Sequence, residues 1–147
     1  MDRYCLDACA LIAFLNDEDG SDKVDDLLDK AEKGKISLFM SKVQLLEVYY
    51  DRIYTAGIEA AKERVLSILA EPITILDIIT DNVLYEAGRF KTSYDMSLAD
   101  AIGIATTSDI GATFVTSDHS ELEAIEQHEP ISFLWLPAKK NNSSHSF

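Results

Sequence analysis

The sequence predicts an α/β protein in which helices cover both faces of a parallel sheet. Segments typical of strands and of helices alternate from residue 3 to residue 136, a pattern that favours parallel strands joined by crossover helices. The chain has 147 residues and contains no repeat, no glycine-rich phosphate loop and no interior linker. It therefore predicts one domain, since a domain usually has 100–200 residues.

Hydrophobic spacing and capping residues mark the expected elements. Ser41 and Gln44 match the capping-box pattern at the start of a helix, and so do Ser120 and Glu123; Thr80 is expected to cap another helix. The expected strands cover about residues 3–6, 36–40, 73–78, 112–116 and 131–136. The expected helices cover about residues 8–15, 23–33, 41–55, 58–69, 80–93 and 97–107, with a short one from residue 120.

The composition is that of a soluble globular domain, with 47% hydrophobic and 27% charged residues. No apolar run approaches the roughly 20 residues that span a bilayer, and the N-terminus lacks the basic and apolar regions of a signal peptide. We therefore expect a cytoplasmic protein without a membrane contact. Residues 1–137 are expected to form the domain, and residues 138–147 a disordered tail.

The two cysteines, Cys5 and Cys9, have no second pair with which to complete a zinc site. We interpret both as small buried apolar residues in a reducing compartment.

The net charge is −13, from 13 basic and 26 acidic residues. Such acidity weighs against a nucleic-acid binder, because phosphate contacts need Lys and Arg. Net charge describes the whole surface, however, and carboxylates that bind a metal ion also contribute to it. The charge favours a basic protein partner.

Two aspartates, Asp7 and Asp118, fall where expected strands end. Open parallel sheets bind ligands outside the carboxyl ends of their strands. The alternative for each residue is a helix cap or a turn, for which aspartate is well suited.

Two further acids lie within expected helices. Asp100 is surrounded by apolar residues, and an unpaired buried carboxylate is costly unless it is protonated or binds a cation. It could instead be the acidic half of a capping box with Ser97. Glu47 has Val43 and Tyr50 as neighbours one turn away, but it could equally be a solvated glutamate.

Together these four carboxylates predict a site for a hard divalent cation, Mg²⁺ or Mn²⁺. Such an ion can polarise a phosphate and lower the pKa of an attacking water, so that no covalent nucleophile is needed. None of the three histidines suggests a catalytic arrangement, and His119 is expected to be a solvated turn residue.

The order and contexts of the acids resemble the PIN domain, and especially the VapC-like toxins of toxin–antitoxin pairs. The matching stretches are residues 4–12, 41–48, 97–101 and 115–118, which span nearly the whole chain. The resemblance implies a three-layer α/β/α fold around about five parallel strands. It also implies a Mg²⁺- or Mn²⁺-dependent endoribonuclease whose catalytic, metal-binding acids are Asp7, Glu47, Asp100 and Asp118. In this resemblance Thr116 supports the last of these acids, and Ser97 occupies a polar position beside the third.

Family resemblance further implies a homodimer, and an antitoxin whose basic C-terminal tail blocks the acidic cleft. Two positions depart from the family pattern. Cys9 stands where Ser, Thr or Asn is common, so a hydrogen bond to the first aspartate is expected to be weaker. Leu122 stands where an aromatic residue is common. RNA contacts are expected from a few of Lys42, Arg52, Lys62, Arg64, Arg89 and Lys91.

Two other functions remain open. One is a Mg²⁺-dependent phosphotransfer or phosphatase domain, although the second aspartate of dehalogenase-type phosphatases is absent after Asp7, and no lysine occurs between Lys91 and Lys139, where a receiver domain needs one. The other is a catalytically silent PIN-type module that binds RNA or protein.

Overall fold

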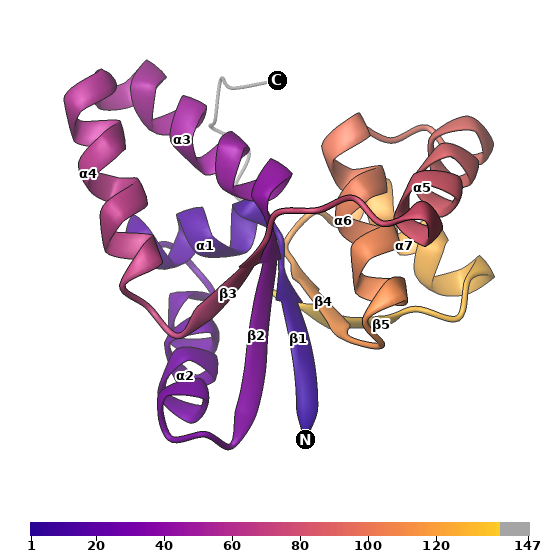
Figure 1. The fold of residues 1–147 in the computed structure, drawn as a ribbon, viewed down its shortest axis with the longest axis horizontal. Coiled ribbons are helices and arrows are strands. Elements are labelled where there is room, and N and C mark those ends of the chain that lie inside the picture. Colours follow the sequence, from indigo (N-terminus) through magenta and orange to yellow (C-terminus); the bar gives the residue numbers. More distant parts are fainter. Residues whose placement is uncertain (139–147) are drawn as a thin grey trace.

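The computed structural model describes residues 1–138, which form a five-stranded, entirely parallel sheet with helices on both faces (Figure 1). The strands are β1 Asp2–Leu6, β2 Ile36–Ser41, β3 Ile73–Leu76, β4 Thr113–Thr116 and β5 Ser132–Trp135. The helices are α1 Ala8–Leu15, α2 Ser21–Glu32, α3 Lys42–Ala56, α4 Ile58–Leu69, α5 Asp81–Ser93, α6 Leu98–Asp109 and α7 His119–His128. The predicted fold class is confirmed. The prediction of a disordered tail concerns residues 138–147, of which all but the first lie outside the described residues.

The three layers follow from the alternation of side chains along each strand. Cys5 and Phe114 belong to a buried cluster with α5, α6 and α7, whereas the next residues, Leu6 and Val115, belong to a second cluster with α1 to α4. In Figure 1 the first four helices accordingly lie on one side of the sheet and the last three on the other. Each central strand is thus buried on both faces, as parallel strands usually are.

The strand order is β3-β2-β1-β4-β5. The chain leaves β1 toward β2 and β3 and then returns to β4 on the other side of β1, which makes the β1–β4 boundary the topological switch point of the sheet. Ligands of open α/β sheets bind at such a boundary, outside the carboxyl ends of the strands. Asp7 directly follows β1, and Asp118 lies two residues after β4.

Two of the three predicted helix caps differ from the expectation. Ser41 does cap α3, by accepting from the N–H of Val43, but Gln44 does not complete a capping box, because its carboxamide bonds to Ala8 and Ala99. These partners are 36 and 55 residues away in sequence, so local spacing could not reveal them.

At α7 the predicted capping box is wrong. The helix begins at His119 after Asp118, and the hydroxyl of Ser120 donates to the Asp118 carboxylate at 3.1 Å. The Thr80 cap of α5 is confirmed, with Thr80 Oγ1 accepting from Val83 N–H.

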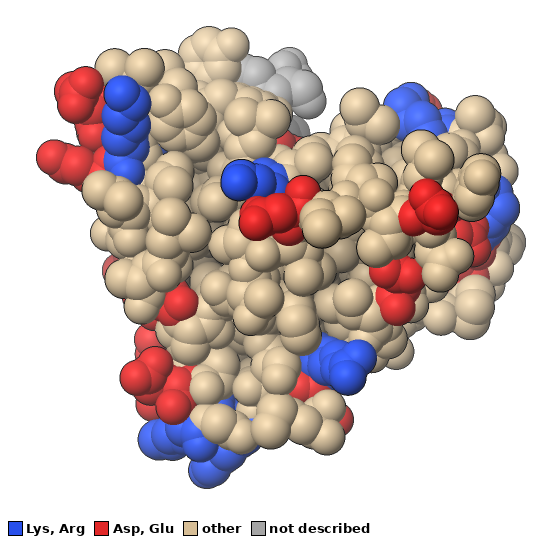
Figure 2. Space-filling model, viewed as in Figure 1, with Lys and Arg blue, Asp and Glu red and all other residues tan. Residues whose placement is uncertain are grey.

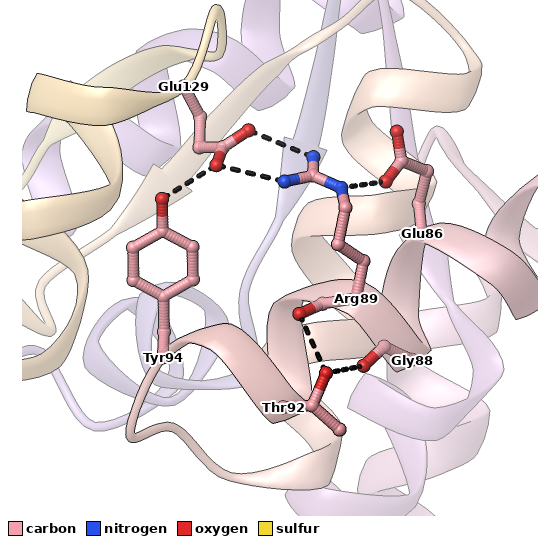
Figure 3. Close-up of polar contacts among 6 residues, drawn as sticks. All are labelled: Glu86, Gly88, Arg89, Thr92, Tyr94 and Glu129. Atoms are coloured by element: carbon pink, nitrogen blue, oxygen red, sulfur yellow. Dashed lines mark hydrogen bonds and ion pairs between the residues drawn. The ribbon is translucent and has the colours of Figure 1, made fainter.

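A charged cluster ties α5 to the segment between α7 and β5 (Figure 3). Arg89 donates two hydrogen bonds to Glu129, at 3.0 and 2.9 Å, and a third to Glu86 at 2.6 Å. The hydroxyl of Tyr94 donates to Glu129 at 2.6 Å. The side chain of Glu129 is only 11% exposed, so this bidentate pair is better shielded from water than an ordinary surface ion pair.

No helix among residues 1–138 has both the length and the apolar character needed to cross a bilayer.

Candidate active site

Asp7 is a buried carboxylate at the carboxyl end of β1, with 3% of its surface exposed. Its position is the N-cap of α1, yet its side chain caps no backbone N–H. The carboxylate instead accepts hydrogen bonds from Thr116 Oγ1 at 2.6 Å and from Cys9 Sγ at 3.0 Å. The helix-cap alternative therefore does not account for the side chain.

Thr116, the last residue of β4, links two of the acids. Its hydroxyl donates to Asp7 Oδ2, and its oxygen accepts the backbone N–H of Asp118 at 3.0 Å. Thr116 has no exposed surface. The resemblance associated this residue with the last acid only, whereas the structure places it between the first and the last.

Asp118 is half-buried at the start of α7 and, like Asp7, makes no side-chain cap. Asp100 is 7% exposed in the first turn of α6, where Ser97 Oγ accepts its backbone N–H at 3.1 Å. Ser97 thus caps the helix, and the Asp100 carboxylate lies beside Asp118 and Glu121, with one oxygen of each within 4.8 Å of the others.

Glu121 is the residue that the sequence analysis missed. It is exposed on α7, three residues after Asp118. Because residues three apart share a helix face, the spacing from Asp118 would have indicated Glu121 if the helix had been placed one residue earlier. The predicted start at Ser120 left Asp118 outside the helix, so this spacing was not considered.

Glu47 lies half-buried on α3, close enough to Asp7, Asp118 and Glu121 for their charges to act on its carboxyl group. Its pKa is raised to about 7, first by burial and then by the charges of Asp7 and Asp118. The structure thus brings Glu47 within electrostatic reach of the other acids, and it is not an ordinary solvated glutamate.

The electrostatics of the whole group are those of carboxylates that repel one another. Burial raises the pKa of Asp7, and Asp118 adds to the effect, while the bonds from Thr116 and Cys9 oppose it. Burial, Asp7 and Glu121 raise the pKa of Asp100 to about 9. Such a group is destabilising when all its members are ionised and unpaired.

A hard divalent cation fits this donor set. Its members are all carboxylates, which Mg²⁺ and Mn²⁺ prefer, and three of them place oxygens within 4.8 Å of one another. A cation would offset the repulsion that raises the pKa values of Asp100 and Glu47. The residues that could hold it are Asp100, Asp118 and Glu121, together with Asp7 and Glu47.

Cys9 is not the apolar residue that we expected. It is half-buried, its thiol donates to Asp7, and its sulfur accepts the backbone N–H of Ser117 at 3.4 Å. Burial raises the pKa of this thiol well above its usual value, so it remains a donor at neutral pH. Cys5 is buried and free, as expected.

The expectation of a solvated His119 is also wrong. Its Nε2 lies 2.7 Å from the carbonyl of Leu136, and its ring lies 4.6 Å from that of Trp135. These contacts dock the start of α7 against the end of β5, so His119 helps to fix the position of Asp118.

Several of the candidate RNA-contact residues are engaged elsewhere. Arg89 is held by Glu86 and Glu129 (Figure 3), Lys42 forms an ion pair with Asp77, and Arg64 donates to Asn16.

The PIN domain family model matches residues 4–126. No curated protein sequence matches the chain. Among solved structures, VapBC2 of Rickettsia felis, bound to a promoter DNA fragment, has 15% identity and a TM-score of 0.69, covering 91% of this chain and 98% of the other. VapBC-1 of nontypeable Haemophilus influenzae has 13% identity and a TM-score of 0.66, covering 90% and 97%.

A third similar structure is VapC20 of Mycobacterium tuberculosis, described as a sarcin-ricin loop cleaving toxin. It has 17% identity and a TM-score of 0.62, and covers 82% of this chain and 94% of the other. At such identities the similarity shows a shared fold. The matched residues include the carboxyl ends of β1 and β4, which precede Asp7 and Asp118, as well as α3 and α6. The chain belongs to the PIN domain family.

Proposed function

We propose that this chain is a metal-dependent endoribonuclease that hydrolyses RNA phosphodiester bonds. The observation that carries the proposal is the convergence of acids from separate parts of the chain: Asp7 after β1, Glu47 on α3, Asp100 on α6, and Asp118 with Glu121 at the start of α7. A shared function as ligands of a divalent cation explains why a fold would bring these charges together despite their repulsion.

Each residue has a distinct part in this proposal. Asp7, Asp100, Asp118 and Glu121 hold Mg²⁺ or Mn²⁺, with Glu47 at the border of the site. Thr116 and Cys9 orient the carboxylate of Asp7, and Ser97 fixes the start of α6. When bound, the ion would supply charge for the phosphate and a lower pKa for the attacking water.

RNA as substrate is supported by the family and by the similar structure of VapC20, a toxin that cleaves the sarcin-ricin loop. Arg52 is the basic residue we favour for RNA contact, because it lies on α3, five residues after Glu47. Only a few cationic contacts are needed to hold a phosphate backbone at one groove of an acidic protein.

A protein partner is also part of the proposal. Several of the similar structures are toxin–antitoxin complexes, and a basic antitoxin tail would be attracted by the charge of −13. A groove of about 500 Å³ between α3 and α4, lined mainly by Leu45, Leu46, Tyr49, Val65 and Leu66, offers apolar surface to such a partner. In Figure 2 the surface over these helices is largely free of charged groups, apart from their outer edge and the start of α3, where Lys42 pairs with Asp77. We also propose a homodimer, as the family resemblance implies.

The experiment is incubation of the purified chain with a mixed RNA pool, with Mg²⁺ or Mn²⁺ and then with EDTA. Single-stranded DNA and a phosphomonoester are tested in parallel. Cleavage of RNA internally, lost with EDTA, supports the proposal. Release of phosphate from the monoester alone would favour the phosphatase alternative, and binding of RNA without cleavage in either metal would favour the silent module.

A further inference from the structure

We infer that Gln44 is a positioning residue, whose carboxamide fixes the spacing between the chain segments that carry Asp7 and Asp100. The inference rests on the proposed metal site and deepens it. Gln44 is completely buried, although glutamine is rarely buried unless its polar atoms are satisfied.

The two ends of the carboxamide bond to backbone groups beside two different acids. Oε1 accepts the N–H of Ala8 at 2.9 Å, and Nε2 donates to the carbonyl of Ala99 at 2.8 Å. Ala8 directly follows Asp7, and Ala99 directly precedes Asp100. One planar group therefore links the start of α1 to the start of α6.

Helix α3, which carries Gln44, also carries a third acid, Glu47. Gln44 lies three residues before Glu47, on the same helix, and residues at this spacing are neighbours on the helix surface. The rigid first turns of three helices thus meet at one side chain, each within three residues of a candidate metal ligand. In Figure 1, α1 and α6 lie on opposite sides of the sheet, and α3 begins at the end of the sheet between them.

Gly103 makes room for this arrangement. A Cβ atom at position 103 would lie 2.8 Å from Gln44 Nε2, closer than real Cβ contacts, and 3.1 Å from Phe114 Cζ, closer than most of them. Gly103 is one turn after Ala99 on α6, so both face the same side of the helix. The carbonyl of Ala99 accepts the hydrogen bond from Gln44 Nε2, and the missing side chain of Gly103 leaves room for that amide group. The pair of residues, and not glutamine alone, defines the close approach of α3 and α6.

A positioning role and a merely structural one make different predictions. Both predict a lower melting temperature when Gln44 is replaced, because Ala8 N–H and Ala99 C=O lose a partner. Only the positioning role predicts a weaker affinity for the ion in protein that is still folded. Groups behind the metal ligands typically contribute about 10- to 100-fold in affinity.

The test is the Mn²⁺ dissociation constant of the RNA-free full-length chain, measured by electron paramagnetic resonance of free Mn²⁺. We expect Gln44→Met to raise the constant by about 10- to 100-fold. The matched control is Phe90→Leu, a change of a fully buried residue on α5, which lowers the melting temperature and leaves the constant unchanged. An unchanged constant in folded Gln44→Met would overturn the inference.

Gly103→Ala provides a second, independent disturbance and decides the question if Gln44→Met does not fold. It should raise the Mn²⁺ dissociation constant as well, and the double variant should bind no more weakly than Gln44→Met alone, because both act through one contact. Fully additive effects of the two changes would contradict the inference.

Asp100→Asn, measured alongside, separates this inference from the proposed function. If the wild type binds Mn²⁺ and Asp100→Asn does not, the proposed metal site is supported. The dissociation constants of Gln44→Met and Gly103→Ala then decide the role of Gln44. If the wild type binds none, or Asp100→Asn binds equally well, the proposed site is wrong and the role of Gln44 is overturned with it.

Discussion

Thr116 Oγ1 donates a 2.6 Å hydrogen bond to the carboxylate of Asp7 and accepts a 3.0 Å bond from the backbone N–H of Asp118. One hydroxyl at the end of β4 therefore sets the relative positions of the first and last acids across the switch point of the sheet. The arrangement is pre-organised before any ion binds.

Thr116→Val should reduce RNA cleavage about 10- to 100-fold, because it keeps the shape of the side chain but removes both hydrogen bonds. It should also lower the free energy of unfolding by about 1–3 kcal/mol, since the Asp118 N–H loses its buried acceptor. Cleavage rates and urea unfolding check the two effects. Thr116→Ser retains the hydroxyl and should stay near wild-type activity; equal losses in the two variants would mean that the hydroxyl is not responsible.

Glu121→Gln should weaken Mn²⁺ binding about tenfold, as expected for loss of one charged ligand from the group with Asp100 and Asp118. Glu123, two residues further on the same helix, contacts His119 instead and supplies the control. Calorimetric titration of both variants with Mn²⁺ checks this. Equal affinities for Glu121→Gln and Glu123→Gln would exclude Glu121 from the site.

The ion-free protein should lose stability as the pH rises. Burial and neighbouring charges raise the pKa of Asp100 from 3.8 to about 9, so the folded state binds a proton that the unfolded state releases. This contribution is complete below the unfolded pKa and is lost as the pH rises through the folded pKa, by up to about 1.4 kcal/mol per pH unit.

Asp100→Asn removes this titration, so its unfolding free energy in EDTA should depend less on pH between about pH 5 and about pH 9. Urea unfolding at several pH values checks it against the wild type. Parallel curves for the two proteins would show that Asp100 is ionised throughout. For the same reason Mn²⁺ affinity of the wild type should rise with pH, because the ion displaces protons.

Glu129→Gln should destabilise the fold by roughly 1 kcal/mol and leave cleavage unchanged. Glu129 joins Arg89 and Tyr94 on the α5 side of the molecule, and its charge-assisted bonds are only partly shielded. Melting temperature and cleavage rate are the two measurements. A loss of activity greater than the loss of folded protein would show that the Arg89 cluster contributes to the site.

The strands and helices could be predicted closely because each depends on the spacing of apolar residues within a few turns. Asp7, Asp100 and Asp118 could be singled out for a similar reason, since strand ends and an apolar helix are local features. Gln44 and Glu121 could not. Gln44 matched a local capping box, but its carboxamide bonds to Ala8 and Ala99, which are distant in sequence. Glu121 was missed because the capping box of Ser120 and Glu123 placed the start of the helix after Asp118.

Cys9 and His119 illustrate the same limit. Composition favours an apolar role for a cysteine, and position favours a solvated role for a histidine after a strand. The thiol instead bonds to Asp7, and the imidazole bonds to a carbonyl 17 residues away. Neither contact produces a repeating pattern of residues in the sequence.

RNA cleavage by Asp100→Asn and by Asp109→Asn decides whether the acidic group is the catalytic site. Both aspartates lie on α6, but Asp109 is at its other end, bonded to Thr80 and Asn82. With Mg²⁺ or Mn²⁺ and a mixed RNA pool, the account predicts that Asp109→Asn cleaves like the wild type and that folded Asp100→Asn does not cleave. Full activity of the Asp100 variant would contradict the assignment of these acids as the catalytic site.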